Sequence, residues 1–321
     1  MAGLKIFSGN ANRPLAEDVC RCIGVPLGKA LVGRFKNGET RVRIEEHVRG
    51  ADVFVIQPTS SPSDHHVMEL LIMSDALRRA SADRITAVIP YYGYAKQEKK
   101  SAGREPITAK LVANLITTAG VDRVVALDLH APAIQGFFDI PVDNLTAIPF
   151  LADLLVKEGI EDVVAVSPDV GGVARANDFR YRINAELAVI AKRRPKPDEA
   201  EALEMVGQVD GKCAVIVDDM ISTGGTLEVA ANLLHERGAR AVYAYAVHPV
   251  FAGNAFELIE RSFLDRVVVT NTVTVPPETR DNKIQVVNIG WLIAEAIQRI
   301  HEGRSISAMF ETRRFQQELL I

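Results

Sequence analysis

The segment from Val217 to Thr226 has the residue types needed to bind a phosphorylated sugar. A predicted strand runs into the carboxylates Asp218 and Asp219, and a turn with Gly224 and Gly225 then opens a predicted helix. Successive backbone N–H groups in such a turn form an anion nest, and the helix N-terminus adds a favourable dipole. Carboxylates repel phosphate but accept hydrogen bonds from hydroxyls, so the acid pair suits the sugar. The alternative is a solvated turn capped by an aspartate.

Further polar side chains stand after other predicted strands. Asp128 and His130 follow one apolar run, and Asp169 follows another. Ligands of open α/β sheets bind outside the carboxyl ends of the strands, so these are candidate ligand positions. By pattern alone, a lone histidine after a strand is more often structural than a ligand. Lys192 and Arg194 would point the same way on an extended segment, or they form a solvated basic run.

The elements that position these residues alternate along the chain. Eight short apolar runs, rich in β-branched residues, are typical of parallel strands covered on both faces. They are Leu4–Phe7, Val53–Ile56, Ile85–Ile89, Val124–Leu127, Val163–Val166, Ala214–Val217, Val242–Val247 and Val267–Val269. Helices are predicted at Met68–Arg79 (with its apolar positions at Met68, Leu71, Ile72 and Ala76), Ile107–Ala119, Phe150–Lys157 and Thr226–Arg237. This alternation predicts an α/β fold with mainly parallel sheets.

A chain of 321 residues exceeds one typical domain, so we predict two similar α/β domains, 1–146 and 147–310, and a tail, 311–321. A weak internal repeat supports two copies, because Val124–His130 and Val215–Met220 each end an apolar strand in polar residues. The segment Ile284–Phe310 is predicted as strand, helix and strand, and could pack on either domain. His65 and His66 are expected to form an exposed loop pair.

The composition is that of an ordinary globular protein, with 48% hydrophobic and 24% charged residues. The net charge of −4 provides no overall electrostatic footprint for nucleic acid. Residues 1–10 lack a long apolar run, and no stretch approaches the roughly 20 apolar residues of a membrane span, so we expect neither a signal peptide nor a membrane-spanning helix. The three cysteines form no disulfide framework, and we expect reduced thiols in a cytoplasmic protein.

The Val217–Thr226 segment resembles the phosphoribosyl-binding loop shared by phosphoribosyltransferases and ribose-phosphate pyrophosphokinases (PRPP synthetases). Further matches to the synthetases run in order along nearly the whole chain. They are Arg34–Glu39, Glu69–Met73, Ile89–Gln97, Pro106–Lys110, Asp128–Ala131, Gln135–Asp143, Ser167–Gly172 and Lys192–Pro195. The resemblance implies two type I phosphoribosyltransferase-like domains with the active site between them. It also implies diphosphoryl transfer from ATP to the C1 hydroxyl of ribose 5-phosphate, which gives PRPP and AMP with Mg²⁺ and supplies nucleotide, histidine and tryptophan biosynthesis.

The resemblance also implies residue roles. Lys192 and Arg194 match the catalytic basic pair, and His130 and Asp169 match the metal site. The ATP-binding matches are Phe35, Asn37, Gly38, Glu39, Lys96, Gln97, Lys99 and His130, with residues 93–105 as a closing lid. The ribose 5-phosphate matches are Arg194, Asp218, Asp219, Ser222, Thr223, Gly224, Gly225 and Thr226. The matches to a regulatory site for activating phosphate and for ADP are Arg49, Gln135, Ser305 and Ser307.

Some positions depart from the family pattern. Lys96 stands where the family usually has Arg, and Ser222 stands where many members have Asp; the other departures are His47, Glu98 and Ala191. The expected partners are ATP, ribose 5-phosphate and further copies of the chain, as a homohexamer by resemblance. Two alternatives remain: a phosphoribosyltransferase, which leaves roughly the first half of the chain without a purpose, and a non-catalytic regulatory relative that binds synthetase subunits.

Overall fold

The computed structural model describes residues 3–193, 202–277 and 283–310, and it divides the chain into two compact units. Unit 1 contains residues 3–145 and 289–310, and unit 2 contains the described residues from 146 to 288. The predicted tail, 311–321, lies outside the described residues. Of the segment after Ile284, the strand belongs to unit 2 and the helix to unit 1.

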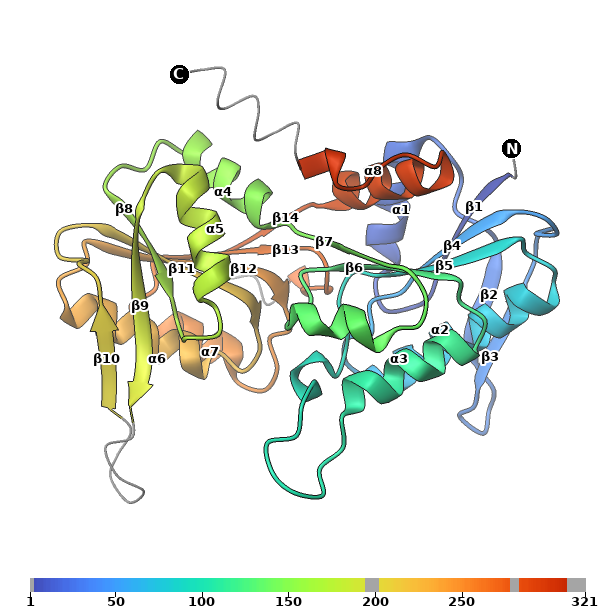
Figure 1. Ribbon diagram of the computed structural model, residues 1–321, viewed down its shortest axis with the longest axis horizontal. Coiled ribbons are helices and arrows are strands. Elements are labelled where there is room, and N and C mark those ends of the chain that lie inside the picture. The colour runs from blue at the N-terminus through green and yellow to red at the C-terminus, as the bar shows by residue number, and fades with distance from the viewer. Residues whose placement is uncertain (1–2, 194–201, 278–282, 311–321) are drawn as a thin grey trace. The chain divides into compact units, whose positions relative to one another are not determined.

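Unit 1 is built on a sheet of five parallel strands. Their order is β1 (Leu4–Ser8), β4 (Asp52–Ile56), β5 (Arg84–Ile89), β6 (Arg123–Leu127) and β7 (Val142–Leu145). Helices α2 (Ser63–Arg79) and α3 (Thr108–Thr118) cover one face, and α1 (Arg13–Ile23) and α8 (Gly290–His301) cover the other (Figure 1). Every residue of β4 is buried, as expected of a strand covered on both faces.

Three smaller elements complete unit 1. An antiparallel hairpin of β2 (Ala30–Arg34) and β3 (Thr40–Ile44) packs against α2. The short 3₁₀ helices η1 (Ala95–Gln97) and η2 (Pro132–Phe137) follow β5 and β6, respectively. All three elements therefore lie outside the main sheet, two of them just past the carboxyl ends of its strands.

Unit 2 is built on a sheet of seven strands, parallel except for one antiparallel edge strand. Their order is β10 (Ala202–Val206), β9 (Glu186–Arg193), β8 (Val163–Ser167), β11 (Cys213–Ile221), β12 (Ala241–Pro249), β13 (Arg266–Thr270) and β14 (Ile284–Val287). Helices α4 (Ile148–Lys157) and α5 (Val173–Ile183) pack together on one face, and α6 (Gly225–Glu236) and α7 (Ala255–Arg261) on the other (Figure 1).

The strand order in unit 2 reverses at β8. The chain leaves β8 for β9 on one side, and later returns to place β11 on the other side. Such a topological switch point opens a crevice at the carboxyl ends of the two central strands. The fold therefore places the expected ligand site after β8 and β11.

The structure confirms the α/β class and all eight predicted strands. It corrects two predictions for the segment that forms α2. Helix α2 begins at Ser63, so His65 and His66 lie within a helix and are not an exposed loop pair. Its buried face carries Leu70, Met73 and Leu77, whereas Met68 is 48% exposed. The sequence has apolar residues on two faces of this helix, and packing against the sheet selects one of them.

One strand prediction is wrong. The last part of Ile284–Phe310 does not form a strand, because residues 308–310 are helical. The three cysteines are free, as expected from the sequence. Among the described residues, no helix is both long and apolar enough to cross a membrane.

Candidate functional site

An arginine of α5 joins the two carboxylates near the end of β11. Arg175 Nη1 lies 3.0 Å from Asp218 Oδ1, and Arg175 Nη2 lies 3.3 Å from Asp219 Oδ1. The side chain of Asp219 is 3% exposed, and those of Arg175 and Asp218 are partly buried. Because β11 continues to Ile221, the acid pair belongs to the strand and does not follow it. One guanidinium therefore holds both carboxylates side by side.

The acid pair favours a bound proton when no ligand is present. Burial, and after it the charge of Asp219, raise the pKa of Asp218 to about 8 despite the opposing charge of Arg175. Near neutral pH the ligand-free pair therefore holds a proton that belongs to the pair as a whole. Hydroxyl donors on a ligand would stabilise the ionised form and expel this proton.

The turn after β11 presents backbone donors. Helix α6 begins at Gly225, and Gly224 precedes it in the left-handed conformation, with φ of 82°. A Cβ atom on Gly224 would lie 3.3 Å from the Cα of Ala255, so conformation and space both require glycine. No side chain caps α6 within the described chain, and the N–H groups of its first turn lack intrahelical acceptors. This helix start can therefore bind an anion.

Asp169 lies in the turn that connects β8 to α5. Its Oδ1 accepts a hydrogen bond from the N–H of Gly172, at 2.8 Å, while the Ser167 hydroxyl donates to its main-chain oxygen, at 2.7 Å. The carboxylate is exposed yet oriented. Because the same turn begins the helix that carries Arg175, Asp169 and the acid pair share the carboxyl edge at the switch point.

The predicted catalytic pair is only partly described. Lys192 lies in β9, next to β8, where its backbone pairs with Leu203 of β10. The extended backbone expected at Lys192 is therefore present. The side chain of Lys192, and the whole of Arg194, lie outside the described structure.

In unit 1, the hairpin presents the predicted nucleotide-binding residues at its tip. Phe35 is 49% exposed, and the Arg41 guanidinium lies 5.4 Å from the centre of its ring. The Asn37 side chain accepts a hydrogen bond from the N–H of Glu39, at 3.2 Å, and Gly38 adopts a φ of 91°. This turn between two strands exposes an aromatic face and polar groups together.

The other nucleotide-binding candidates lie past the carboxyl ends of β5 and β6, which are neighbours in the sheet. Lys96, Gln97 and Lys99 are exposed, and the Thr108 hydroxyl donates to Gln97 Oε1 at 2.6 Å. His130 follows Asp128, whose φ of 41° marks a sharp turn after β6. The structure therefore gathers these candidates at one edge of unit 1.

The regulatory candidates do not lie together within one chain. Arg49 precedes β4. At the start of the same strand, Asp52 Oδ2 lies 2.7 Å from Nδ1 of His301, the last residue of α8. Ser305 and Ser307 follow this anchored end of α8. Gln135 lies in η2, after β6. Since the strands are parallel, Arg49 lies at the amino ends of the strands and Gln135 lies at their carboxyl ends.

Arg175 is the site residue that the sequence did not reveal. It lies 43 positions before Asp218 and forms no recognisable motif with it. Arg175 lies in the first turn of a helix that follows a strand and two glycines. This position is the sequence signal that could have identified it as a site residue. Helix starts at a switch point face the ligand crevice, so a basic residue there is a candidate.

Unit 2 carries an acid pair and a glycine turn at the switch point of a mainly parallel sheet, and the chain contains two α/β units. These features define the phosphoribosyltransferase-type class of α/β proteins. Residues 4–120 match the family model for the N-terminal domain of ribose phosphate pyrophosphokinase. Residues 191–311 match the model for the phosphoribosyl synthetase-associated domain.

Individual relatives agree with these models over nearly full length. The chain is 53% identical over 308 residues to the ribose-phosphate pyrophosphokinase of Halalkalibacterium halodurans, covering 96% of this chain and 98% of the relative. It is 52% identical over 307 residues to that of Bacillus subtilis, covering 96% of this chain and 97% of the relative. The crystal structure of phosphoribosylpyrophosphate synthetase from Mycobacterium smegmatis matches with a TM-score of 0.89 and 41% identity, over 94% of this chain and 99% of that one. The chain belongs to the ribose-phosphate pyrophosphokinase family.

Proposed function

We propose that this chain is a ribose-phosphate diphosphokinase, which transfers the β,γ-diphosphoryl group of ATP to the C1 hydroxyl of ribose 5-phosphate. The C1 oxygen bonds to the β-phosphorus, the bond between that phosphorus and the α,β-bridging oxygen breaks, and the hydroxyl proton is released. The products are 5-phosphoribosyl 1-diphosphate and AMP. The observation that carries the proposal is the Arg175–Asp218–Asp219 cluster beside the uncapped start of α6, in a chain with full-length relatives of this family.

The ribose 5-phosphate site is the carboxyl edge of β11. Asp218 and Asp219 accept hydrogen bonds from the ribose hydroxyls, and Arg175 keeps the two carboxylates in register. Residues 222–226 bind the 5-phosphate through backbone N–H groups and through the hydroxyls of Ser222, Thr223 and Thr226. This arrangement separates the negative carboxylates from the negative phosphate.

Lys192 and Arg194 stabilise the transferring group. Diphosphoryl transfer needs little covalent chemistry from the protein, and catalysis depends on positioning and on neutralising charge at the phosphate oxygens. The position of Lys192 on β9, beside β8, supports its assignment to the same crevice as the acid pair. Arg194 also contacts ribose 5-phosphate.

The residues present fit a Mg²⁺ ion, which polarises the phosphates when it is bound. Mg²⁺ prefers oxygen ligands and usually retains several waters, being held by one or two carboxylates and by substrate phosphates. Asp169 offers an exposed and oriented carboxylate of this kind, and His130 is the second proposed residue. Within the described chain, no cluster of three His, Cys, Asp or Glu side chains could form an all-protein cage.

ATP binds to residues of unit 1. The ring of Phe35 stacks on the adenine, and Asn37, Gly38 and Glu39 contact its edge. Lys96, Gln97, Lys99 and His130 contact the nucleotide from the carboxyl edge of the sheet. The segment 93–105 closes over it and excludes water that would otherwise hydrolyse ATP.

The proposal includes assembly, regulation and location. We propose a homohexamer in which the hairpin of one copy reaches the nucleotide of its neighbour. Phosphate and ADP act through Arg49, Gln135, Ser305 and Ser307, which requires more than one copy because Arg49 and Gln135 lie at opposite edges of one sheet. The free cysteines support a cytoplasmic location.

The test is release of AMP by the purified chain with Mg²⁺, ATP and ribose 5-phosphate. We expect AMP in proportion to the sugar phosphate supplied, and none when it is omitted. Clean, folded protein that binds both substrates and releases no AMP would instead support a non-catalytic regulatory relative. Repeating the assay with added phosphate and with ADP tests the regulatory residues.

A further inference from the structure

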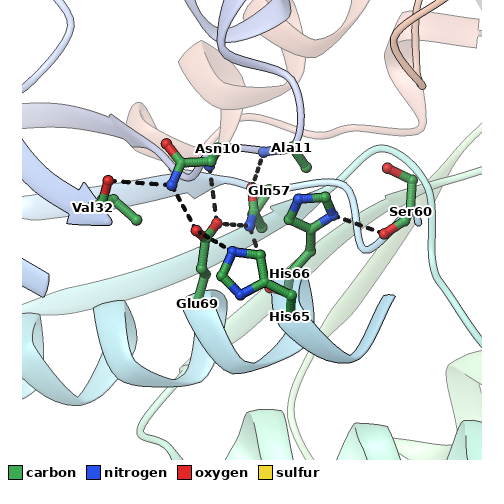
Figure 2. A network of polar contacts seen from close by, with 8 residues as sticks. All are labelled: Asn10, Ala11, Val32, Gln57, Ser60, His65, His66 and Glu69. Atoms are coloured by element: carbon green, nitrogen blue, oxygen red, sulfur yellow. Dashed lines mark hydrogen bonds and ion pairs between the residues drawn. The ribbon is translucent and has the colours of Figure 1, made fainter. Parts of the chain in front are cut away.

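Three hydrogen bonds and one histidine contact converge on the carboxylate of Glu69, which lies on α2 near the carboxyl edge of the unit 1 sheet (Figure 2). Asn10 donates twice, from its backbone N at 3.1 Å and from Nδ2 at 2.6 Å. Gln57 Nε2 donates at 2.8 Å, and His65 Nε2 lies 3.0 Å away. The side chain of Glu69 has no exposed surface, and four donors match the acceptor capacity of a carboxylate.

The orientation of this network follows from a backbone donor. The N–H of Ala11 can only donate, and it lies 3.1 Å from Gln57 Oε1, so Gln57 must turn its amide nitrogen toward Glu69. A Cβ atom on Gly9 would lie 2.3 Å from Gln57 Oε1, so the loop after β1 packs directly on this amide. His66 attaches the start of α2 to the preceding loop, because its Nδ1 lies 2.8 Å from the main-chain oxygen of Ser60. The network is therefore a fixed frame.

Asn10 extends this frame to the hairpin. Its Nδ2 also donates to the main-chain oxygen of Val32, at 3.2 Å (Figure 2). Val32 lies in β2, which pairs with β3 in a two-stranded sheet. Asn10 Nδ2 therefore bridges the buried carboxylate of Glu69 and the main chain of β2.

The bridge lies close to the hairpin tip. Phe35 follows Val32 by three residues, which corresponds to about 10 Å along a strand. A change in the angle of β2 at Val32 is therefore transmitted to the exposed ring of Phe35. The apolar side chains of Ala30, Val32, Val42 and Ile44 pack against the core. Apolar packing is non-directional, whereas a hydrogen bond to a fixed frame also sets a direction.

We propose that Asn10 is a positioning residue for the nucleotide: by bridging Glu69 and Val32, it sets the angle at which the hairpin presents Phe35 and Asn37. The inference rests on the proposed function, in which the hairpin tip contacts ATP. His65, one of the histidines without an assigned role in the sequence, completes the frame through its contact with Glu69.

Two variants provide a matched comparison. Asn10→Ala and His65→Ala each remove one side-chain donor from Glu69 Oε1, and only Asn10→Ala also releases Val32. Asn10 is exposed, so its replacement is compatible with folding. A third variant, Asn10→Asp, keeps the shape of the side chain. It replaces the amide donor with a carboxylate oxygen, which cannot donate to Glu69 or to the main-chain oxygen of Val32.

The experiment measures AMP release as ATP and ribose 5-phosphate are varied in turn, together with hydrogen exchange of residues 30–44. Asn10→Ala should raise KM for ATP about fivefold, the factor expected for one lost hydrogen bond, with kcat and KM for ribose 5-phosphate near wild type. Asn10→Asp should raise KM for ATP further, and both variants should speed exchange in the hairpin. His65→Ala should leave KM for ATP and hairpin exchange within about twofold of wild type.

Two results would overturn the proposal. One is an Asn10→Ala enzyme with wild-type KM for ATP and wild-type hairpin exchange. The other is an equal effect of Asn10→Ala and His65→Ala, which would indicate a general role in stability. Failure of wild-type protein to release AMP would count against the proposed function alone, because the exchange measurement reports on the hairpin without any reaction.

Discussion

Arg175 and Asp218 are 43 residues apart in the sequence, yet Arg175 Nη1 lies 3.0 Å from Asp218 Oδ1. The contact connects the start of α5 to the end of β11, which are the two elements beside the switch point of unit 2. The same guanidinium reaches Asp219. Without it, the acid pair would lose a positive partner that supports its ionised form.

Replacing Arg175 should therefore impair the sugar site. We expect Arg175→Ala to lower kcat/KM for ribose 5-phosphate about tenfold or more, because the carboxylates lose a shared, charge-assisted partner. Arg175→Lys should fall between Ala and wild type, since an ammonium cannot span both carboxylates. Steady-state kinetics with ribose 5-phosphate as the varied substrate measures the effect.

Arg180 provides the control on the same helix, because its guanidinium lies 4.2 Å from the centre of the Tyr181 ring and not at the acid pair. Arg180→Ala should keep wild-type kinetics. Equal losses in Arg175→Ala and Arg180→Ala would mean that only the stability of α5 matters.

The stability of the ligand-free protein should fall as pH rises. Folding raises the pKa of Asp218 to about 8, so the folded chain binds this proton more tightly than the unfolded chain does. The resulting stability is full below the ordinary carboxyl pKa and is lost as pH rises toward about 8. Urea unfolding from about pH 5 to about pH 9 should show this decline, and Asp218→Asn should flatten it. An identical pH profile in Asp218→Asn would rule out this carboxyl as the source.

Ribose 5-phosphate binding should have the opposite pH dependence. The sugar hydroxyls favour the ionised acid pair, so binding releases a proton and strengthens as pH rises through neutrality. Calorimetry in buffers of different ionisation enthalpy counts this proton. Uptake of a proton on binding would contradict the assigned role of the pair.

Lys192 should act on the chemical step. We expect Lys192→Ala to lower kcat about a hundredfold or more, with little change in KM for ribose 5-phosphate, because the lysine stabilises charge that develops on the transferring oxygens. Lys212 is the matched control, since it pairs with Glu186, at the start of β9, at 2.6 Å. Wild-type turnover in Lys192→Ala would remove it from the mechanism, and an equal loss in Lys212→Ala would point to stability.

Thr86 offers a test of the core. Its buried hydroxyl has no hydrogen-bond partner among the described residues, so Thr86→Val should raise the free energy of unfolding by about 1 kcal/mol. Thr270 is equally buried in a strand, but its hydroxyl donates to the main-chain oxygen of Val247 at 2.7 Å. Thr270→Val should therefore lower stability by about 1 kcal/mol. Urea unfolding measures both, and a loss of stability in Thr86→Val would reveal a partner for its hydroxyl.

Local patterns in the sequence were sufficient to predict eight apolar strands, because a parallel strand covered on both faces must be apolar along its length. Val53–Ile56 is such a case. The glycine turn at Gly224 was predictable for a similar reason, since its residues are adjacent in the chain. The order of the strands and the reversal at β8 depend on contacts between distant segments, which no local pattern records.

The roles that the sequence missed are those of residues whose partners lie far away in the chain. Arg175 matters because of Asp218, and Glu69 is buried because Asn10 and Gln57 supply its donors. The interpretation of His65 and His66 as a loop failed for the same reason. Their acceptors, Glu69 and the main chain at Ser60, allow polar rings to pack within a helix.

The most direct test of the account is the ratio of AMP released to ribose 5-phosphate consumed by the purified chain with Mg²⁺ and excess ATP. A ribose-phosphate diphosphokinase should release one AMP for each sugar phosphate, with 5-phosphoribosyl 1-diphosphate as the other product. Release of ADP, release of AMP without the sugar phosphate, or no product from folded protein would contradict it.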